Sequence, residues 1–304
     1  MRALALLCLA AGICAAQSDL VAALDQIASS EISRQKIPGV AAVVVKDGHA
    51  IWAEGLGVAS LESKAPVTPD TLFRIGSARP FLASAAFELS RQGRLQLDAP
   101  AGDYLFGLDD KHAQLSTRKL LSPPSEGGEE AVAARLIQTI RFRPAPALLD
   151  EMVFSPLGMQ HTTFSPALAM TYPLAMGHTA DRNVIRPLEG TALFSSAHDL
   201  ARFLAAFLNG GKLGDQEAIS PALIAALSSE GGFGLDWDAE RGVRLIRHTT
   251  AAPGFASAIL MAPEFRTGVV VLANRDGASA LTIAQKLLER SLPVRFPQAA
   301  AIVR

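Results

Sequence analysis

Apolar and polar residues recur with two different periods along this chain, and the period changes where turn residues occur. Near the N-terminus, a helix over residues 19–36 is predicted by apolar side chains that share one face: Leu20, Leu24, Ile27 and Ile32. Two β-rich runs follow within residues 38–57, and Asp47-Gly48 separates them. Because both turn residues tolerate positive φ, this pattern predicts a β-hairpin.

The C-terminal part of the chain shows the same succession of patterns. The stretch FASAILMAPEFRTGVVVLANRDG predicts two strands around a turn at residues 263–268, and a helical pattern begins at Ser279. Between the two ends, the chain is mostly helical or looped. In SAHDLARFLAAFLNGG, Ser196 is the expected N-cap of a helix, and Gly210 marks its C-terminal end.

These elements predict an α+β fold in a single domain, residues 17–304. An antiparallel sheet is expected to form from both chain ends, about residues 17–75 and 233–304, with the terminal helices flanking it. A helical part, about residues 76–232, is expected to be inserted between them. A crevice between the sheet and the helical part is the natural place for a site.

Composition fits a globular chain and excludes some classes of partner. Of the 304 residues, 49% are hydrophobic and 19% are charged, which argues against disorder. The formal net charge is -1 and no basic block stands out. We therefore expect no binding to nucleic acid or to an anionic membrane surface.

The first residues, MRALALLCLAAGICAAQS, predict a secretory signal peptide over residues 1–16 with cleavage after Ala16. A membrane anchor is disfavoured because the apolar run is short. A lipoprotein signal on Cys14 is disfavoured because bulky Ile13 precedes it. The expected mature protein is exported, periplasmic or extracellular, has no membrane span, and contains no cysteine, since Cys8 and Cys14 both lie in the signal.

The stretch TLFRIGSARPFLASAAFELSRQGRL contains a candidate nucleophile, Ser77, just before a predicted helix over residues 81–92. The start of a helix favours an oxyanion, but a hydroxyl needs a base three or four residues on, or from elsewhere. Position 80 is a proline, and Arg79 stays protonated, so it can hold an anion but cannot accept a proton. Local chemistry alone favours a serine that merely caps the helix.

Other chemistry-bearing patterns are weak. The six histidines show no paired ligand spacing, and no Gly-rich phosphate loop occurs, so we expect neither a metal nor a cofactor. The letters Ser-x-x-Lys occur at residues 116–119, which we interpret as a solvated helical turn. Glu129 and Glu130 are interpreted in the same way, as an exposed helix start.

Several segments, in the right order over nearly all of the mature chain, resemble the β-lactamase-related, penicillin-recognising serine hydrolases. That family includes class C β-lactamases, DD-peptidases and esterases. The segments are IPGVAAVVVKDGHAIWAEGLGVAS, the stretch around FRIGSARPF, VFSPLGMQHTTF, ALFSSAHDLARFLAAFLNGGKL, FGLDW and RHTTAAPGFASAILMAPEFRTGVVVLANRDG. The resemblance implies a β-lactamase/transpeptidase-like fold with a shortened helical subdomain.

The family's catalytic motifs carry over incompletely. The resemblance makes Ser77 the nucleophile, but GSARPF looks like the Ser-x-x-Lys motif with one residue lost, and Arg79 stands near the lysine's place. The tyrosine motif is absent, because residues 129–152 contain no Tyr, Lys or Asn; Tyr172 is the one remaining stand-in. The third motif survives as His248-Thr249-Thr250, expected to line a pocket, with Thr250 crowding it where the family has glycine.

Three functions follow from this incomplete set. The first is an exported, catalytically impaired family member that keeps a groove for a small acyl compound, a peptide or a cell-wall fragment. The second is an active hydrolase or esterase in which Ser77 works with Arg79, His248 or Tyr172. The third is a decaying or truncated gene product that folds poorly.

Overall fold

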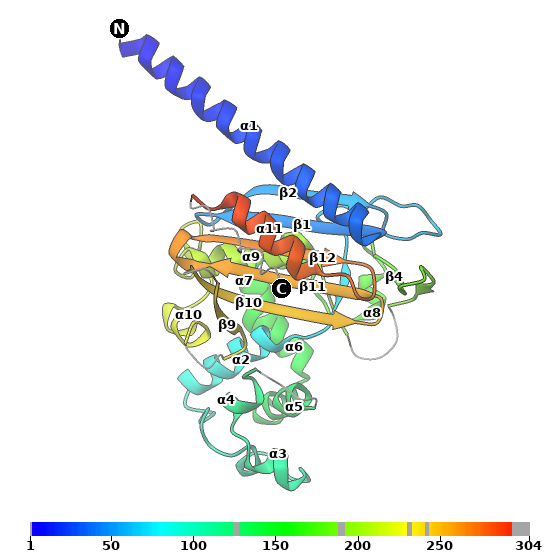
Figure 1. The fold of residues 1–304 in the computed structure, drawn as a ribbon. Coiled ribbons are helices and arrows are strands. Elements are labelled where there is room, and N and C mark those ends of the chain that lie inside the picture. Colours follow the sequence, from blue (N-terminus) through cyan, green and yellow to red (C-terminus); the bar gives the residue numbers. More distant parts are fainter. Residues whose placement is uncertain (1, 124–127, 188–191, 230–232, 241–242, 294–304) are drawn as a thin grey trace, which may run out of the picture.

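The structure is a computed structural model that describes residues 2–123, 128–187, 192–229, 233–240 and 243–293. Its centre is a six-stranded antiparallel sheet in the order β2-β1-β12-β11-β10-β9 (Figure 1). Both chain ends contribute strands, as the sequence predicts. The strands are β1 (Gly39–Lys46), β2 (His49–Gly57), β9 (Asp236–Glu240), β10 (Val243–Ala252), β11 (Phe255–Ala262) and β12 (Thr267–Ala273).

The two predicted hairpins are confirmed. Asp47 and Gly48 turn between β1 and β2 with φ of 49° and 80°, which explains the choice of residues that tolerate positive φ. β11 and β12 pair around a short 3₁₀ turn, η3 (Pro263–Phe265). In β1 and β12 every side chain but that of Lys46 is buried, because helices cover both faces of the sheet centre.

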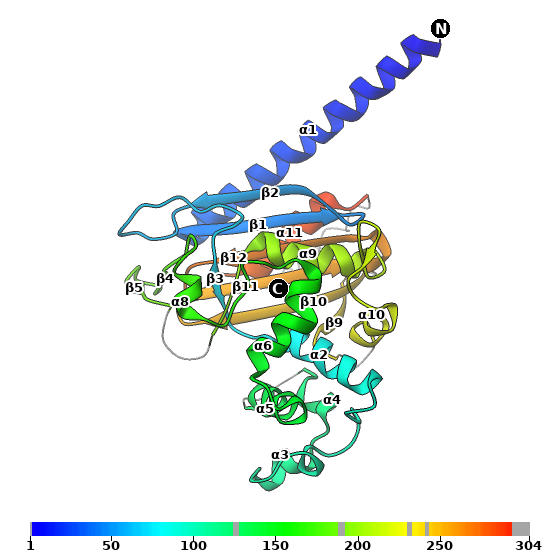
Figure 2. The same cartoon turned by 180° about the vertical axis from the view of Figure 1, so that it is seen from behind.

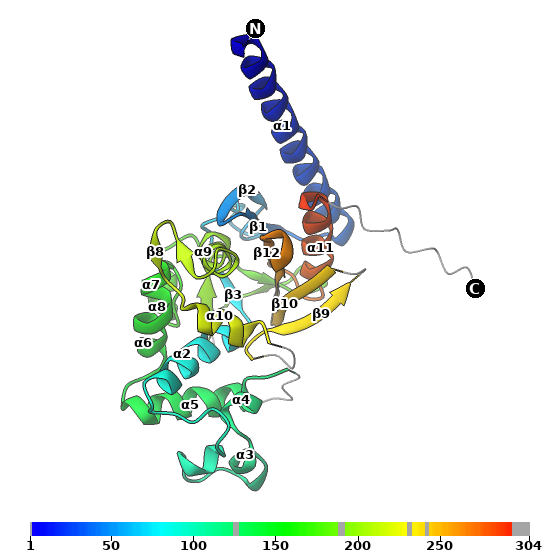
Figure 3. The same ribbon diagram turned by 90° about the vertical axis from the view of Figure 1, so that its left-hand side faces the viewer.

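Two helices cover one face of the sheet and one helix covers the other (Figure 3). α1 (Arg2–Gln35) and α11 (Ala280–Ser291) pack together on the first face, and α9 (Ala197–Leu208) packs on β1 and β12 from the second (Figure 2). The predicted N-cap is confirmed, because Ser196 accepts from the N–H of Asp199. The helical pattern predicted from Ser279 corresponds to α11, where Ser279 accepts from the N–H of Thr282.

The predicted helix over residues 19–36 is present as the C-terminal part of α1, with Leu24 and Ala28 fully buried. α1 also runs through the predicted signal residues, and its N-terminal part extends away from the sheet (Figure 1). Within the described residues, no helix combines the length and apolarity needed to cross a membrane.

The helical part lies beyond one face of the sheet (Figures 1 and 2). Its helices are α2 (Arg79–Arg91), η1 (Ala101–Asp103), α3 (Asp110–Gln114), α4 (Thr117–Leu120), α5 (Glu129–Arg141), α6 (Ala145–Leu149), the π-turn η2 (Asp150–Phe154), α7 (Ser155–Leu157), α8 (Pro166–Ala169) and α10 (Pro221–Leu227). Short strand pairs accompany them: β3 (Phe73–Ile75) with β6 (Leu193–Ser195), β4 (Gly177–His178) with β5 (Val184–Ile185), and β7 (Lys212–Leu213) with β8 (Gln216–Glu217). The proposed sheet and helical boundaries within residues 17–304 stay a prediction.

An aromatic cluster fixes α2 in the helical part. Phe81 lies edge-to-face against Phe154 and Phe203, with ring centroids 5.2 and 5.4 Å away. Such pairs each add about 1 kcal/mol beyond the burial of their area. α2 begins at Arg79, two residues before the predicted start, and the chain enters it directly from β3. The cluster thereby fixes the loop between β3 and α2.

Candidate active site

Ser77 lies in the short connection between β3 and α2, against the end of β10. The N–H of Gly76 donates to Thr250 Oγ1 at 3.1 Å. A Cβ at position 76 would lie 2.3 Å from the carbonyl oxygen of Ala251, so the close approach of the two backbones requires glycine. β9 pairs with β10 only over Val243–Arg247, which leaves the end of β10 free to face this connection.

The hydroxyl of Ser77 has a carboxylate partner. Ser77 Oγ donates to Glu130 Oε2 at 2.7 Å, and the N–H of Ala78 donates to Glu130 Oε1 at 2.6 Å. Ser77 Oγ in turn accepts from the N–H of Arg79 at 3.2 Å. Glu130 thus joins the first turn of α5 to the residues just before α2, although Ser77 and Glu130 are 53 positions apart in sequence.

The interpretation of Glu129 and Glu130 as an exposed helix start is therefore wrong. Glu129 is 6% exposed and lies 3.7 Å from the amine of Lys111, and Glu130 is half-buried against Ser77. One signal in the sequence was available. The residue before α5 is Gly128, which has no side chain to cap the helix, so an acidic first turn was free for another role. The Ser-x-x-Lys letters at residues 116–119 are a helical turn, as predicted, with Ser116 as the cap of α4.

Arg79 contacts the segment that leads into β9. Its Nε donates to the carbonyl of Gly234 and its Nη2 to Asp236 Oδ2, each at 3.3 Å. The side chain is 9% exposed. Because burial of an unpaired guanidinium is costly, these contacts to the segment leading into β9 stabilise its position. Arg79 is not among the residues that line the cavity at Ser77.

His248 is buried, and its hydrogen-bond contact with Ser77 is to the backbone carbonyl and not to the hydroxyl. Its Nε2 lies 3.5 Å from the carbonyl oxygen of Ser77, and its Nδ1 has no hydrogen-bond partner among the described residues. Burial, and then the positive charge of Arg79, lower the pKa of His248 to about 3, against the opposing contact with the Ser77 carbonyl. The imidazole is therefore neutral at ordinary pH, with its polar atoms away from Ser77 Oγ.

Thr249 and Thr250 face another part of the surface. Both line a shallow hollow of about 330 Å³ beside the start of α11. Thr250 Oγ1 also shares a hydrogen bond of 2.6 Å with Ser257 Oγ on β11. Thr250 thus links β10 to Gly76 by a hydrogen bond. That either threonine binds a ligand stays a prediction.

The cavity beside Ser77, here called the Ser77 cavity, has a volume of about 490 Å³. Among the described residues that line it, the polar side chains are those of Arg74, Ser77 and Glu130. Its walls are otherwise apolar, with larger side chains from α2, α6 and β6 and the segments after β10 and before α8: Leu82, Leu149, Phe164, Leu193 and Pro253. A concave apolar site with a few convergent polar groups is the usual form of a small-molecule site.

A family model described as Beta-lactamase matches residues 19–129 and 125–291. This chain belongs to the Beta-lactamase family. The family resemblance predicted from the sequence is thereby confirmed. Ser77 lies just before a helix, as predicted, and follows the short strand β3.

Similar proteins carry several names. A Beta-lactamase of Pseudomonas fluorescens is 23% identical, over 86% of this chain and 96% of that protein. The unguisins hydrolase ungD of Aspergillus violaceofuscus is 24% identical, over 85% of this chain. This chain spans only 62% of the length of that hydrolase.

Solved structures confirm the predicted β-lactamase/transpeptidase-like fold. D-alanine carboxypeptidase AmpC from Burkholderia cenocepacia superposes with a TM-score of 0.75 at 22% identity, over 90% of this chain and 99% of that one. The octameric penicillin-binding protein homologue from Pyrococcus abyssi gives 0.77 at 20% identity, over 90% and 77%. At such identities the likeness establishes the fold that this Beta-lactamase family member shares.

Tyr172, the one sequence candidate for the missing tyrosine, lies elsewhere in this family member. Its ring packs edge-on against His161, with centroids 4.8 Å apart, and joins a small cluster with Leu72, Ala169 and Phe194. No lysine or tyrosine is among the described residues that line the Ser77 cavity. Of the residues predicted for the site, Ser77 lines the cavity. Glu130 also lines it, and the sequence did not predict this.

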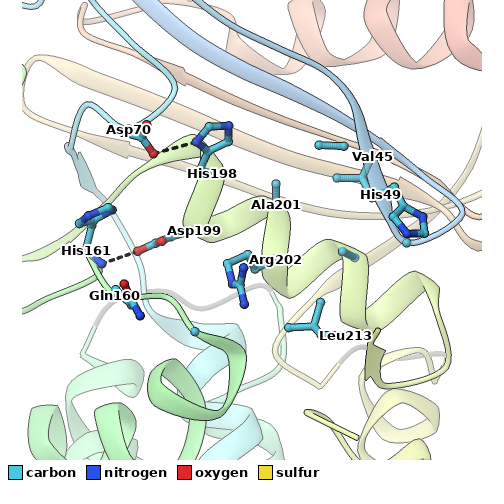
Figure 4. Close-up of a pocket in the computed structure, with 14 residues that line it drawn as sticks. Val45, His49, Asp70, Gln160, His161, His198, Asp199, Ala201, Arg202 and Leu213 are labelled. Carbon is cyan, nitrogen blue, oxygen red and sulfur yellow. Dashed lines mark hydrogen bonds and ion pairs between the residues drawn. The ribbon is translucent and has the colours of Figure 1, made fainter. Parts of the chain in front are cut away.

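A second concavity, here called the α9 groove, has a volume of about 530 Å³ and lies between the β1–β2 turn and α9 (Figure 4). Its charged side chains contact their own fold. His198 Nδ1 lies 2.7 Å from Asp70 Oδ1, and Asp199 accepts from the N–H of His161 at 2.9 Å. Arg202 Nε donates to the carbonyl of Leu157 at 2.6 Å. Among the described residues no group of histidines, cysteines or carboxylates is arranged to hold a metal ion.

Proposed function

We propose that this protein is an exported member of the Beta-lactamase family that keeps the Ser77 cavity as a binding site and reacts there slowly. The ligand we infer is a small acyl compound, a peptide end or a cell-wall fragment with an apolar group. The observation that carries the proposal is the hydrogen bond from Ser77 Oγ to a carboxylate in an apolar cavity whose described lining residues include no lysine or tyrosine.

Weak activation of the serine supports impaired turnover. A positioned general base contributes about 10²–10⁴ in rate, and its efficiency follows the affinity of the base for the proton. A carboxylate is a weaker base than a lysine amine or a tyrosinate. Arg79 is committed to Asp236, and His248 is neutral and contacts the carbonyl of Ser77. Acylation by a reactive compound stays chemically accessible, whereas efficient turnover is not expected.

The inferred ligands agree with the names of the relatives. These include a β-lactamase, an esterase and a D-alanine carboxypeptidase, so esters, β-lactams and D-alanine peptides are the compounds to try. Export is supported by the apolar N-terminus and the small residues before Gln17. Cleavage after Ala16 would leave Leu24 and Ala28, the buried part of α1, within the mature chain.

The test is to incubate the purified mature protein with a fluorescent penicillin and a chromogenic short-chain ester, beside Ser77→Ala. We expect slow labelling that needs Ser77, little turnover, and a ligand-induced rise in melting temperature in both proteins. Rapid turnover that needs Ser77 would replace the proposal with an active hydrolase. Absence of any ligand effect on a protein that melts cooperatively would contradict the binding site itself.

A further inference from the structure

We propose that Glu130 is the proton acceptor of Ser77 and that the Ser77 cavity therefore reacts with activated esters of short apolar acids. The inference rests on the proposed acylation of Ser77 and names the residue that enables it. Nothing in the sequence motifs of the chain assigns this role to Glu130.

The geometry fixes the carboxylate at both oxygens. Oε2 accepts the Ser77 hydroxyl at 2.7 Å, within the range for direct proton transfer, and Oε1 accepts the N–H of Ala78 at 2.6 Å. Glu130 lies in the first turn of α5, and Ala78 is the N-cap residue of α2. The N-terminal ends of two helices thus meet at the carboxylate, and both favour a negative charge there.

The other titratable groups near Ser77 cannot perform this step. Arg79 stays protonated and is bound to Asp236. The Nε2 of His248 lies 3.5 Å from the Ser77 carbonyl oxygen rather than from Oγ. Arg74 also lines the cavity and, as a guanidinium, cannot accept a proton. Glu130 is the described group in hydrogen-bond contact with the hydroxyl proton.

The proposed step balances in atoms and charge. The Ser77 Oγ–H proton moves to Glu130 Oε2 while Oγ forms a bond to the ester carbonyl carbon. The tetrahedral intermediate then collapses, the bond to the leaving oxygen breaks, and the alcohol leaves either as its anion or with the proton from Glu130. When the alcohol leaves as its anion, Glu130 first releases its proton to solvent. In hydrolysis a water then gives a proton to the Glu130 carboxylate and attacks the acyl carbon, and Ser77 Oγ leaves and recovers the proton.

The same chemistry selects the substrate class. A carboxylate activates the serine weakly, so the reaction needs a carbonyl with a good leaving group, such as a phenolate. Amides and β-lactams need a proton delivered to a departing amine, which is more demanding. The walls formed by Leu82, Leu149 and Phe164 suit a short apolar acyl chain.

A structural role for Glu130, as a partner that holds the start of α2, makes a different prediction. Glu130→Gln keeps an acceptor oxygen for the N–H of Ala78 but cannot take up a proton at neutral pH. Glu129→Gln is the matched control, because Glu129 is adjacent on α5, is buried, and does not line the cavity. Glu130→Asp restores a carboxylate at a shorter reach.

The experiment follows acylation of the mature protein by p-nitrophenyl butyrate, with stopped-flow release of nitrophenolate and mass measurement of the acylated serine peptide. We expect Glu130→Gln to lower the acylation rate about 100-fold. Glu130→Asp should recover part of the rate, and Glu129→Gln should keep it. The wild-type rate should fall in acid, and this fall should be missing in Glu130→Gln.

The outcomes separate this inference from the proposed function. Acylation of Glu130→Gln at the wild-type rate, or an unchanged acid limb, would overturn the inference and leave the acylation of Ser77 in place. A wild-type protein that is not acylated would overturn the inference and the acylation together. The binding part of the proposed function would then be decided by the ligand-induced change in melting temperature.

Discussion

The Ser77 cavity and the α9 groove have similar volumes, about 490 and about 530 Å³, and opposite chemistry. The described walls of the cavity are mostly apolar apart from Arg74, and in it one hydroxyl converges with one carboxylate. The groove holds several histidines, two aspartates and an arginine, and its charged groups bond to their own fold: His198 to Asp70, Asp199 to the backbone of His161, and Arg202 to a carbonyl.

The number of polar groups therefore does not mark a reactive site. In the groove His198, Asp199 and Arg202 each have a partner within the fold, so these residues support the packing of α9. In the cavity the serine and Glu130 share a proton in surroundings that a substrate can enter. Convergence of two functional groups in an apolar space is the more informative feature.

We expect the largest change in the free energy of unfolding to come from His248, the buried imidazole near Ser77, when the pH is lowered. Its pKa is about 3 in the folded protein, while an unfolded histidine titrates near 6.5. Below about pH 6.5 the unfolded chain binds a proton that the folded chain does not, so stability should fall as the pH is lowered toward 3, by on the order of 4 kcal/mol. Urea unfolding from pH 7 to pH 4 measures this loss.

His248→Leu is the informative variant, because Nδ1 has no partner to lose among the described residues. It should cost little at pH 7 and remove most of the acid dependence. His178, whose pKa is also lowered by burial, remains in both proteins, as do the carboxylates of Glu31, Asp98 and Asp109, whose pKa values are lowered by hydrogen bonds, and together they set the residual slope. An unchanged acid dependence in His248→Leu would show that the imidazole is not the buried base responsible.

A tryptophan placed in each of the two concavities should change the rate of Ser77 acylation differently. Ala131 lines the Ser77 cavity and Gln160 lines the groove, and both are exposed, so a tryptophan at either position should be tolerated by the fold. Ala131→Trp should slow Ser77 acylation by about 100-fold, equivalent to about 2.7 kcal/mol, because the ring occupies the approach to the serine. Gln160→Trp should leave the rate unchanged. Equal inhibition by both variants would break the distinction between the two concavities.

The sequence predicted the parts of the fold that depend on neighbouring residues. Asp47-Gly48 predicted a hairpin because both residues adopt positive φ, and Ser196 predicted a helix cap, which it forms with the N–H of Asp199. The family resemblance supplied the topology and the position of Ser77. These features need only local geometry, or a whole-chain pattern that survives substitution.

The sequence could not predict the partners at the site. Glu130 reaches Ser77 across 53 residues, and Arg79 reaches Asp236 across 157. Both contacts depend on how α2, α5 and the segment entering β9 pack. Periodicity carries no information on such contacts, and a carboxylate at a helix start is most simply explained as solvated. The departure of GSARPF from the Ser-x-x-Lys pattern left the partner of Ser77 unpredicted.

The smallest change in free energy of unfolding is expected for Asp199 in the α9 groove. Its variants test whether this residue stabilises the fold through its hydrogen bonds or through its charge. Asp199 Oδ2 accepts from the N–H of His161 and from Thr162 Oγ1 at 2.8 Å, and burial raises the pKa of Asp199. Asp199→Ala leaves these donors unpaired and should cost about 2 kcal/mol in free energy of unfolding. Asp199→Asn keeps one acceptor and removes a charge that burial disfavours, so it should cost less than about 1 kcal/mol. If Asn were as destabilising as Ala, the negative charge itself would be what the groove requires, and the α9 groove would become a candidate site for a cationic ligand.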